Sequence, residues 1–256
     1  MKKHIPTVLA VIAALAITVI ALGAANAQEP TAQTLVPAEL TQTLGDGQTR
    51  PLGEDSAYED MLKTKLTSEK SDKYLYLFES GSGELKAMML TDNAVQTESP
   101  VSESAAAATA QKIVSAAFPG MDLSSFDAKC RYTGSGWTVE LWEKLADDLY
   151  GGRKIAVTLS EGGELETLVR TDTDTGDRQS AASSAISREK AAELALAAID
   201  GDAENAEVSA YKEVRTDGII WQVDIANVDI GNGFTVTYFV TLNALTGEVI
   251  LVDMTR

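Results

Sequence analysis

The sequence repeats itself at a spacing of 84 residues, and this repeat limits the possible folds more than any other feature. In both copies an Arg-x-x-Gly-x-x-Trp segment is followed by a Gly-Glu turn. The recurring residues are Arg131, Gly134, Trp137 and Gly163 in the first copy, and Arg215, Gly218, Trp221 and Gly247 in the second. Shared turn glycines and a shared tryptophan at one spacing predict an internal duplication, in which each copy is a structural unit.

A helix is expected before the tryptophan strand in each copy. Apolar residues recur there at the spacing of one helix face, and Gly120 or Gly201 follows the last of them. They are Ala110, Ile113, Val114, Ala117 and Phe118 in the first copy, and Ala191, Leu194, Ala195, Ala198 and Ile199 in the second. The alternation around Trp137 and Trp221 predicts strands with one apolar face. We therefore expect an α+β fold of two tandem units, each a helix and a four-stranded antiparallel sheet.

The region before the repeat is expected to hold less structure. Residues 28–72 are rich in Thr, Gln, Glu, Gly and Pro, which predicts a linker with a short helix near residues 58–66. Two alternating segments around Gly81-Ser82-Gly83 predict a β-hairpin, interpreted as a degenerate third copy. The predicted division is 1–27 for a signal peptide, 28–72 for a linker, 73–96 for the hairpin, 97–179 for the first unit and 180–256 for the second.

The N-terminus has the parts of an export signal. Two lysines precede an apolar run, residues 8–22, and Ala25-Asn26-Ala27 supplies the small-x-small pattern that a signal peptidase accepts. This run is shorter than the roughly 20 residues of a membrane-spanning helix, which favours cleavage between Ala27 and Gln28. The expected location is secreted or at a bacterial cell envelope, with membrane contact only through the signal peptide. An uncleaved anchor remains the alternative.

The scarcest residues exclude most familiar catalytic chemistry. His4 is the only histidine and Cys130 the only cysteine, so the processed chain has no imidazole for Ser-His-Asp or Cys-His catalysis or for zinc. A single cysteine forms no internal disulfide or thiolate cluster. The net charge of −17, from 21 basic and 38 acidic residues, opposes binding to nucleic acid. We expect a non-enzymatic protein with no cofactor, no metal and no nucleic-acid partner.

The repeated unit resembles a known domain family. A helix, a Trp-x-Val strand and a closing hairpin of the form Asn243-Ala-Leu-Thr-Gly247-Glu248-Val249 are similar to the PepSY domain, over residues 187–254 and less closely over residues 102–171. PepSY domains occur in propeptides of thermolysin-type metallopeptidases and in bacterial envelope and spore-germination proteins. The resemblance implies an extracytoplasmic module that inhibits or regulates peptidases. No peptidase domain accompanies the units here, so the partner is expected to be a separate peptidase or envelope protein.

Two short motifs suggest chemistry and have a simpler structural interpretation. Ser187 and Lys190 fit the Ser-x-x-Lys nucleophile motif, but no partner motif is present and Ser187 stands where a helix N-cap is expected. Asp172, Asp174 and Asp177 begin like a calcium loop, but the glycine is one position early and no glutamate closes the loop. The sequence favours an N-cap and a polar linker, and weak calcium binding stays open.

Equivalent residues of the two copies are further candidate site residues. Glu140 and Asp224 are related carboxylates on the polar face of equivalent strands, and a carboxylate pair could serve a glycosidase. Solvent-exposed acids are the commoner interpretation of such a carboxylate pair. The equivalent Trp137 and Trp221 could form a ligand platform, and packing in the core is again the commoner interpretation. Cys130 aligns with Val214 and is predicted to be a buried, structural thiol. The leading hypothesis is a non-catalytic binding or regulatory protein, and the alternative is an acidic-site ligand binder, metal binder or enzyme.

The processing site provides the first test. The exported protein is expected to begin at Gln28, because Ala25-Asn26-Ala27 follows an apolar core of signal-peptide length. The intact mass of the protein from the culture medium or the envelope measures this directly. A full-length chain retained in the membrane would instead identify the segment as an anchor.

Overall fold

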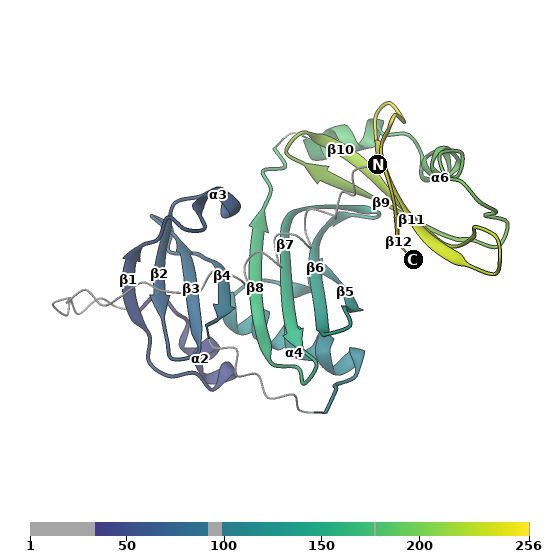
Figure 1. Ribbon diagram of the computed structural model, residues 1–256. Coiled ribbons are helices and arrows are strands. Elements are labelled where there is room, and N and C mark those ends of the chain that lie inside the picture. The colour runs from purple at the N-terminus through teal and green to yellow at the C-terminus, as the bar shows by residue number, and fades with distance from the viewer. Residues whose placement is uncertain (1–33, 92–98, 177, 256) are drawn as a thin grey trace. The chain divides into compact units, whose positions relative to one another are not determined.

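The computed structural model describes residues 34–91, 99–176 and 178–255, and its elements follow one another as three sets of helices and four strands, with a helix inserted after the first strand of the first set (Figure 1). The first set is α2 (Ala38–Leu44), β1 (Arg50–Glu54), α3 (Glu59–Leu62), β2 (Leu66–Lys70), β3 (Tyr74–Glu79) and β4 (Leu85–Leu90). The second is α4 (Glu103–Ala117), η1 (Leu123–Ser125), β5 (Phe126–Tyr132), β6 (Gly136–Ala146), β7 (Leu149–Ser160) and β8 (Leu165–Asp172). The third is α5 (Arg178–Ala181), η2 (Ala182–Ser184), α6 (Arg188–Leu196), β9 (Glu207–Arg215), β10 (Gly218–Asp229), β11 (Thr235–Asn243) and β12 (Val249–Thr255).

The strands form a mixed sheet, which confirms the predicted α+β class. Hydrogen bonds link the twelve strands in the order β1-β2-β3-β4-β8-β7-β9-β10-β11-β12, while β6 pairs with β7 and β5 pairs with β6. β7 and β9 run parallel where Leu149 and Tyr150 face Lys212 and Glu213. A parallel pair was not expected from the sequence.

The chain divides into two compact units, and the division departs from the predicted boundary at residues 179 and 180. Of the described residues, the first unit holds 34–91, 99–123, 128–141 and 155–171. The second holds 124–127, 142–154, 172–176 and 178–255. The tip of the β6–β7 hairpin, residues 142–154, therefore belongs to the second unit although it is part of the first repeat in sequence.

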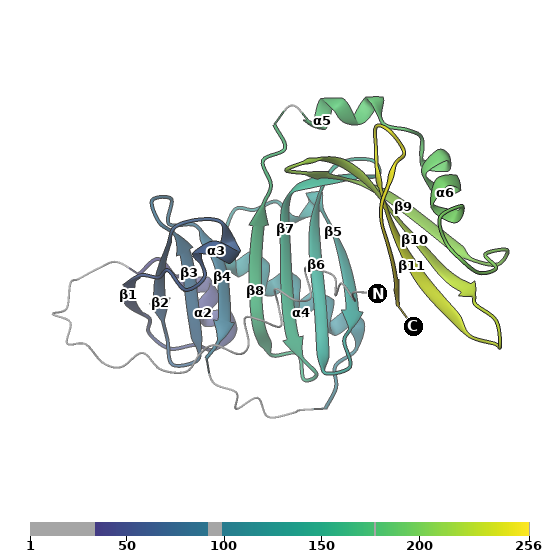
Figure 2. The same cartoon turned by 45° about the horizontal axis from the view of Figure 1, so that its top comes forward.

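In the first unit, residues 34–72 are folded, which corrects the predicted linker. Leu40 on α2 and Leu66 on β2 are fully buried, and Met61 of α3 packs against the core cluster that contains Leu66 and Leu77. Helix α3 confirms the short helix expected near residues 58–66. Figures 1 and 2 show α2 and α4 on one face of this unit's strands. These short elements gain their stability from non-local contacts, which local composition does not reveal.

The helix caps agree with the sequence, and one helix is shorter than predicted. Ser102 accepts the amide of Ala105 at the start of α4, and the apolar face expected for that helix is buried. The equivalent helix α6 ends at Leu196 and leaves Ala198 exposed, so its predicted extent was wrong. Asp202 exchanges two backbone hydrogen bonds with Asp229, of 2.8 and 2.9 Å, which draws the chain onto the β10–β11 hairpin.

The Gly-Glu turns share one hydrogen-bond pattern. In each turn the glutamate carbonyl accepts a backbone amide across the hairpin at 2.8 Å, from Glu79 to Glu84, from Ser160 to Glu164 and from Asn243 to Glu248. Gly247 has a φ of 77°, and a Cβ there would lie 2.8 Å from Cδ1 of Leu194. Glycine is therefore needed both for the turn and for its approach to α6.

An aromatic cluster holds the β6–β7 tip in the second unit. The rings of Trp142, Tyr150 and Tyr211 meet edge to face with centroid distances of 5.6 to 6.3 Å, and Nζ of Lys154 lies 4.1 Å from the Trp142 ring centre. Burial, and then a hydrogen bond to Asp127, raises the pKa of Tyr150 to about 12. Such ring pairs add about 0.5–1.5 kcal/mol each beyond the area they bury.

The two equivalent tryptophans differ in one hydrogen bond. Trp221 is 2% exposed, and its Nε1 donates to the carbonyl of Ile186 at 3.0 Å. Trp137 is half-buried beside Tyr132, and its buried Nε1 has no hydrogen-bond partner among the described residues. The predicted core role is confirmed for Trp221, and of these two equivalent tryptophans Trp137 is the one that leaves its indole nitrogen unsatisfied among the described residues.

This difference predicts unequal costs for one substitution. Trp221→Phe leaves the Ile186 carbonyl unpaired and should lower the free energy of unfolding by about 1–3 kcal/mol more than Trp137→Phe. Urea denaturation of the two variants and the parent chain measures the difference. Equal losses, or a larger loss at Trp137, would contradict the role given to the Trp221 hydrogen bond.

Candidate functional site

The terminal strand β12 exposes a row of large apolar side chains. Its burial pattern contrasts with that of its neighbour β11, whose alternate residues are buried. The exposed fractions are 38% for Val249, 58% for Ile250, 49% for Leu251, 39% for Val252 and 41% for Met254. Contiguous exposed apolar surface of this kind is typical of an interaction site.

The register explains how β12 is left open. Val252 faces Val240 and Met254 faces Tyr238 across the β11–β12 ladder, so both lie on the face that forms the core of this unit. Helix α6 packs on β9, β10 and β11. The core face continues from β11 onto β12, where the side chains of Val252 and Met254 stay exposed among the described residues. Leu251 faces Thr241 on the opposite face, so apolar side chains stand on both sides of the strand.

The edge strand of the first unit, β1, has the opposite character. It is five residues long and wholly exposed, it contains Pro51, and its register shifts between Pro51 and Gly53. Proline and a bulge both prevent a further strand from pairing. β12 has seven residues with the sequence VILVDMT, and it contains neither proline nor a basic side chain. Its outer backbone groups suit the addition of an extended segment.

The charge around β12 is acidic. Glu248 precedes the strand and Asp253 lies within it, where Oδ1 of Asp253 accepts the amide of Met254 at 2.8 Å. Within residues 34–91, 99–176 and 178–255, no group of three or more His, Cys, Asp or Glu side chains is placed to hold a metal. The edge offers backbone pairing, apolar contact and negative charge, and these are the elements of polypeptide recognition.

The residues of the repeat motif have structural surroundings. Arg131 is exposed on β5, and Arg215 holds Oε2 of Glu213 at 2.8 and 3.0 Å. The four motif glycines, Gly134, Gly163, Gly218 and Gly247, stand at or beside hairpin turns. A Cβ on Gly163 would lie 3.4 Å from the side chain of Val101.

The structure tests the Ser-x-x-Lys motif and describes part of the aspartate motif. Oγ of Ser187 accepts the amide of Lys190 at 3.2 Å, and Nζ of Lys190 lies 2.9 Å from Glu193, so the N-cap prediction is confirmed. Asp174 accepts the amide of Gly176 at 3.0 Å as a local turn. Asp172 ends β8, and Asp177 lies outside the described residues. Calcium binding by these aspartates therefore stays a hypothesis.

The paired carboxylates lie on separate strands. Glu140 is half-buried on β6 in the first compact unit, and Asp224 is half-buried on β10 in the second.

Cys130 is less buried than predicted. It is partly exposed on β5, and its Sγ lies 3.8 Å from the carbonyl oxygen of Glu103, whereas the aligned Val214 is 1% exposed. β5 pairs with β6 alone, while β9 has β10 on one side and the tip of β7 on the other. The correction follows from this difference in neighbours, which sequence alignment does not show.

Two further predictions concern the membrane and the signal. Among the helices that the structure describes, none combines the length and apolar character needed to span a bilayer. The signal peptide, its Ala27–Gln28 cleavage site and His4 lie outside the described residues, so these stay predictions.

Comparison with known proteins defines the fold and leaves the family open. The chain has the α+β architecture of a mixed sheet with few helices, and it matches no family model and no curated protein. Among solved structures it is similar to the Bacillus megaterium YpeB C-terminal domain, with a TM-score of 0.53 over 85% of this chain and 95% of that one. The identity is 12%, so this likeness concerns the fold.

The chemistry of Cys130 can be tested by modification. Burial, and then the nearby Glu103, raises the pKa of its thiol, which lowers the reactive thiolate fraction at pH 7. Alkylation at pH 7 should be slower than for a free cysteine, with the rate rising about tenfold per pH unit below the pKa. In denaturant, Cys130 should be alkylated at the same rate as a free cysteine. Faster reaction of the native thiol at pH 7 would indicate a lowered pKa and overturn this assignment.

Proposed function

We propose that this chain is an exported, non-catalytic binding protein of PepSY type that takes up an extended segment of a partner protein along β12. The observation that carries the proposal is the exposed apolar edge, from Val249 to Met254. The helix-plus-four-strand order of the chain supports the view that the repeats are related PepSY-like units. The export signal predicted from the sequence supports a location of this binding outside the cytoplasm.

Strand addition accounts for the features of β12 together. A segment paired with the outer side of β12 would satisfy its edge amides and carbonyls, and apolar side chains of that segment would cover Val252 and Met254 on one face and Leu251 on the other. Burial of apolar area supplies about 25 cal/mol per Å², so both faces would contribute to affinity.

The partner is expected to carry basic residues beside its apolar ones. The chain has a net charge of −17, and Glu248 precedes the apolar edge while Asp253 lies between Val252 and Met254. An acidic surface speeds association with a basic partner, and salt screens this effect. The PepSY resemblance favours a secreted or envelope peptidase as that partner.

The partner class is tested by titrating the processed chain against secreted peptidases of the same organism, with equilibrium binding measured in parallel. We expect saturable binding of at least one peptidase, weakened as salt is raised from low to physiological concentration, together with a change in its activity. Saturable binding without that change would retain the binding function and remove peptidase regulation. The absence of saturable binding up to about 100 μM for all of them would leave a scaffold role.

A matched pair of substitutions tests the edge itself. Leu251→Lys on β12 should weaken partner binding by at least about tenfold, because a charge on an edge strand opposes strand pairing and replaces apolar contact. Leu52→Lys on β1 is the control, since Leu52 is 50% exposed and Leu251 is 49% exposed. Thermal unfolding should change little in either variant, because both side chains already reach solvent. Equal binding by the two variants would exclude β12 as the binding edge.

A further inference from the structure

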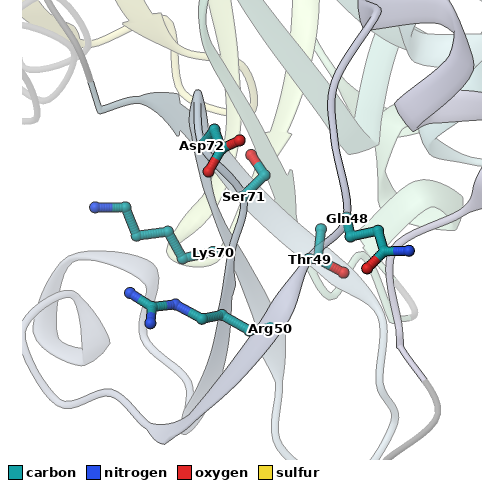
Figure 3. Close-up of a pocket in the computed structure, with 6 residues that line it drawn as sticks. All are labelled: Gln48, Thr49, Arg50, Lys70, Ser71 and Asp72. Carbon is teal, nitrogen blue, oxygen red and sulfur yellow. The ribbon is translucent and has the colours of Figure 1, made fainter.

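Two basic side chains lie opposite each other on β1 and β2 of the first unit. Arg50 on β1 and Lys70 on β2 are direct partners in the antiparallel register. In Figure 3 both side chains extend side by side in the same direction. Neither forms an ion pair with any of the described residues. Like charges placed directly opposite each other on a sheet destabilise it. In a chain with an excess of acidic residues, either position could instead have faced an acid.

Two neighbouring acids, Glu69 and Asp46, bind other groups. The buried carboxylate of Glu69 accepts the hydroxyl of Thr34 at 2.6 Å, the amide of Leu35 at 2.7 Å and the hydroxyl of Thr49 at 3.0 Å. Asp46 accepts the hydroxyl of Tyr76 at 2.5 Å and the amide of Gly47 at 2.9 Å. Strand alternation places Glu69 on the opposite face of β2 from Lys70. Neither carboxylate therefore neutralises the two cations.

The cations line an open hollow of about 530 Å³. Its other lining residues are Gln48, Thr49, Ser71 and Asp72. Oγ of Ser71 is occupied by the backbone of Tyr74, from which it accepts an amide at 2.9 Å. Figure 3 shows the Asp72 carboxylate above Lys70, on the side away from Arg50. The hollow thus has a basic side formed by Arg50 and Lys70 and one acidic group at the other side.

We propose that Arg50 and Lys70 form a binding site for an oxyanion, a phosphate or a carboxylate group. A guanidinium offers a planar fork of donors that matches two oxygens of either group, and an ammonium adds a compact positive charge. Binding would relieve the repulsion between the two cations. Asp72 works against the ligand, so it sets an upper limit on affinity. The site is independent of the β12 edge and of the function proposed for it.

The probes are inorganic phosphate and acetate, added to the processed chain at constant ionic strength set with chloride. A ligand that binds only the folded chain raises the melting temperature of the chain by an amount that depends on the ligand's dissociation constant. Calorimetric titration measures that dissociation constant directly. Saturable binding of phosphate alone identifies a phosphate site, and binding of both probes identifies a general oxyanion site. No saturable effect of either probe would overturn the proposal.

Substitutions of the lining residues test whether the probe binds in the hollow, because removal of a cation and removal of the acid should change the affinity in opposite directions. Arg50→Gln and Lys70→Gln should each weaken binding of the effective probe by about tenfold, the loss typical of a charge-assisted hydrogen bond. Asp72→Asn should strengthen it, because a repelling charge is removed. Lys112→Gln, at an exposed position on α4, is the charge-matched control and should leave binding unchanged. If Lys112→Gln weakens binding as much as Lys70→Gln, or Asp72→Asn weakens it, the assignment fails.

Discussion

The unpaired backbone groups at the edges of an open sheet are the constraint on which the other features depend. Every internal strand satisfies its amides and carbonyls through its neighbours, while an edge strand exposes one row of them to any other extended chain. β1 counters this with Pro51 and a bulge, and β5 with charged residues such as Lys129 and Arg131. β12 has neither device, and among the described residues its apolar side chains and its outer backbone groups stay exposed.

The sequence predicted those parts of the fold that local pattern determines. The apolar stripe of α4, the N-caps at Ser102 and Ser187 and the Gly-Glu hairpins all depend on residues close together in the chain. It failed where stability is non-local. α2, β1 and β2 are short and contribute few apolar residues, such as Leu40 and Leu66. Their burial depends on distant elements, since α2 packs on α4 and Leu66 packs with residues of β3, β4 and β8. The buried Glu69 added to the polar appearance of that segment.

The candidate sites were harder to predict than the fold. The run from Val249 to Val252 is visible in the sequence, but a continuous apolar run is equally typical of a fully buried strand. Its exposure depends on which strands α6 reaches, and this is a property of the assembled unit. The pairing of Arg50 with Lys70 depends on the register of two strands in a segment that looked like a linker. No local signal could have placed these two residues together.

The placement of residues 142–154 affects how the protein can unfold or be divided. Gly151 allows the β7 tip to approach β9, since a Cβ there would lie 2.9 Å from Cβ of Val214, and Tyr150 completes the ring cluster with Tyr211. A chain cut at residue 179 would leave this tip without its aromatic neighbour, and a chain begun at residue 180 would lack the tip altogether. Loss of order in β9 would therefore also release residues 142–154, so no single cut of the chain separates the two stretches.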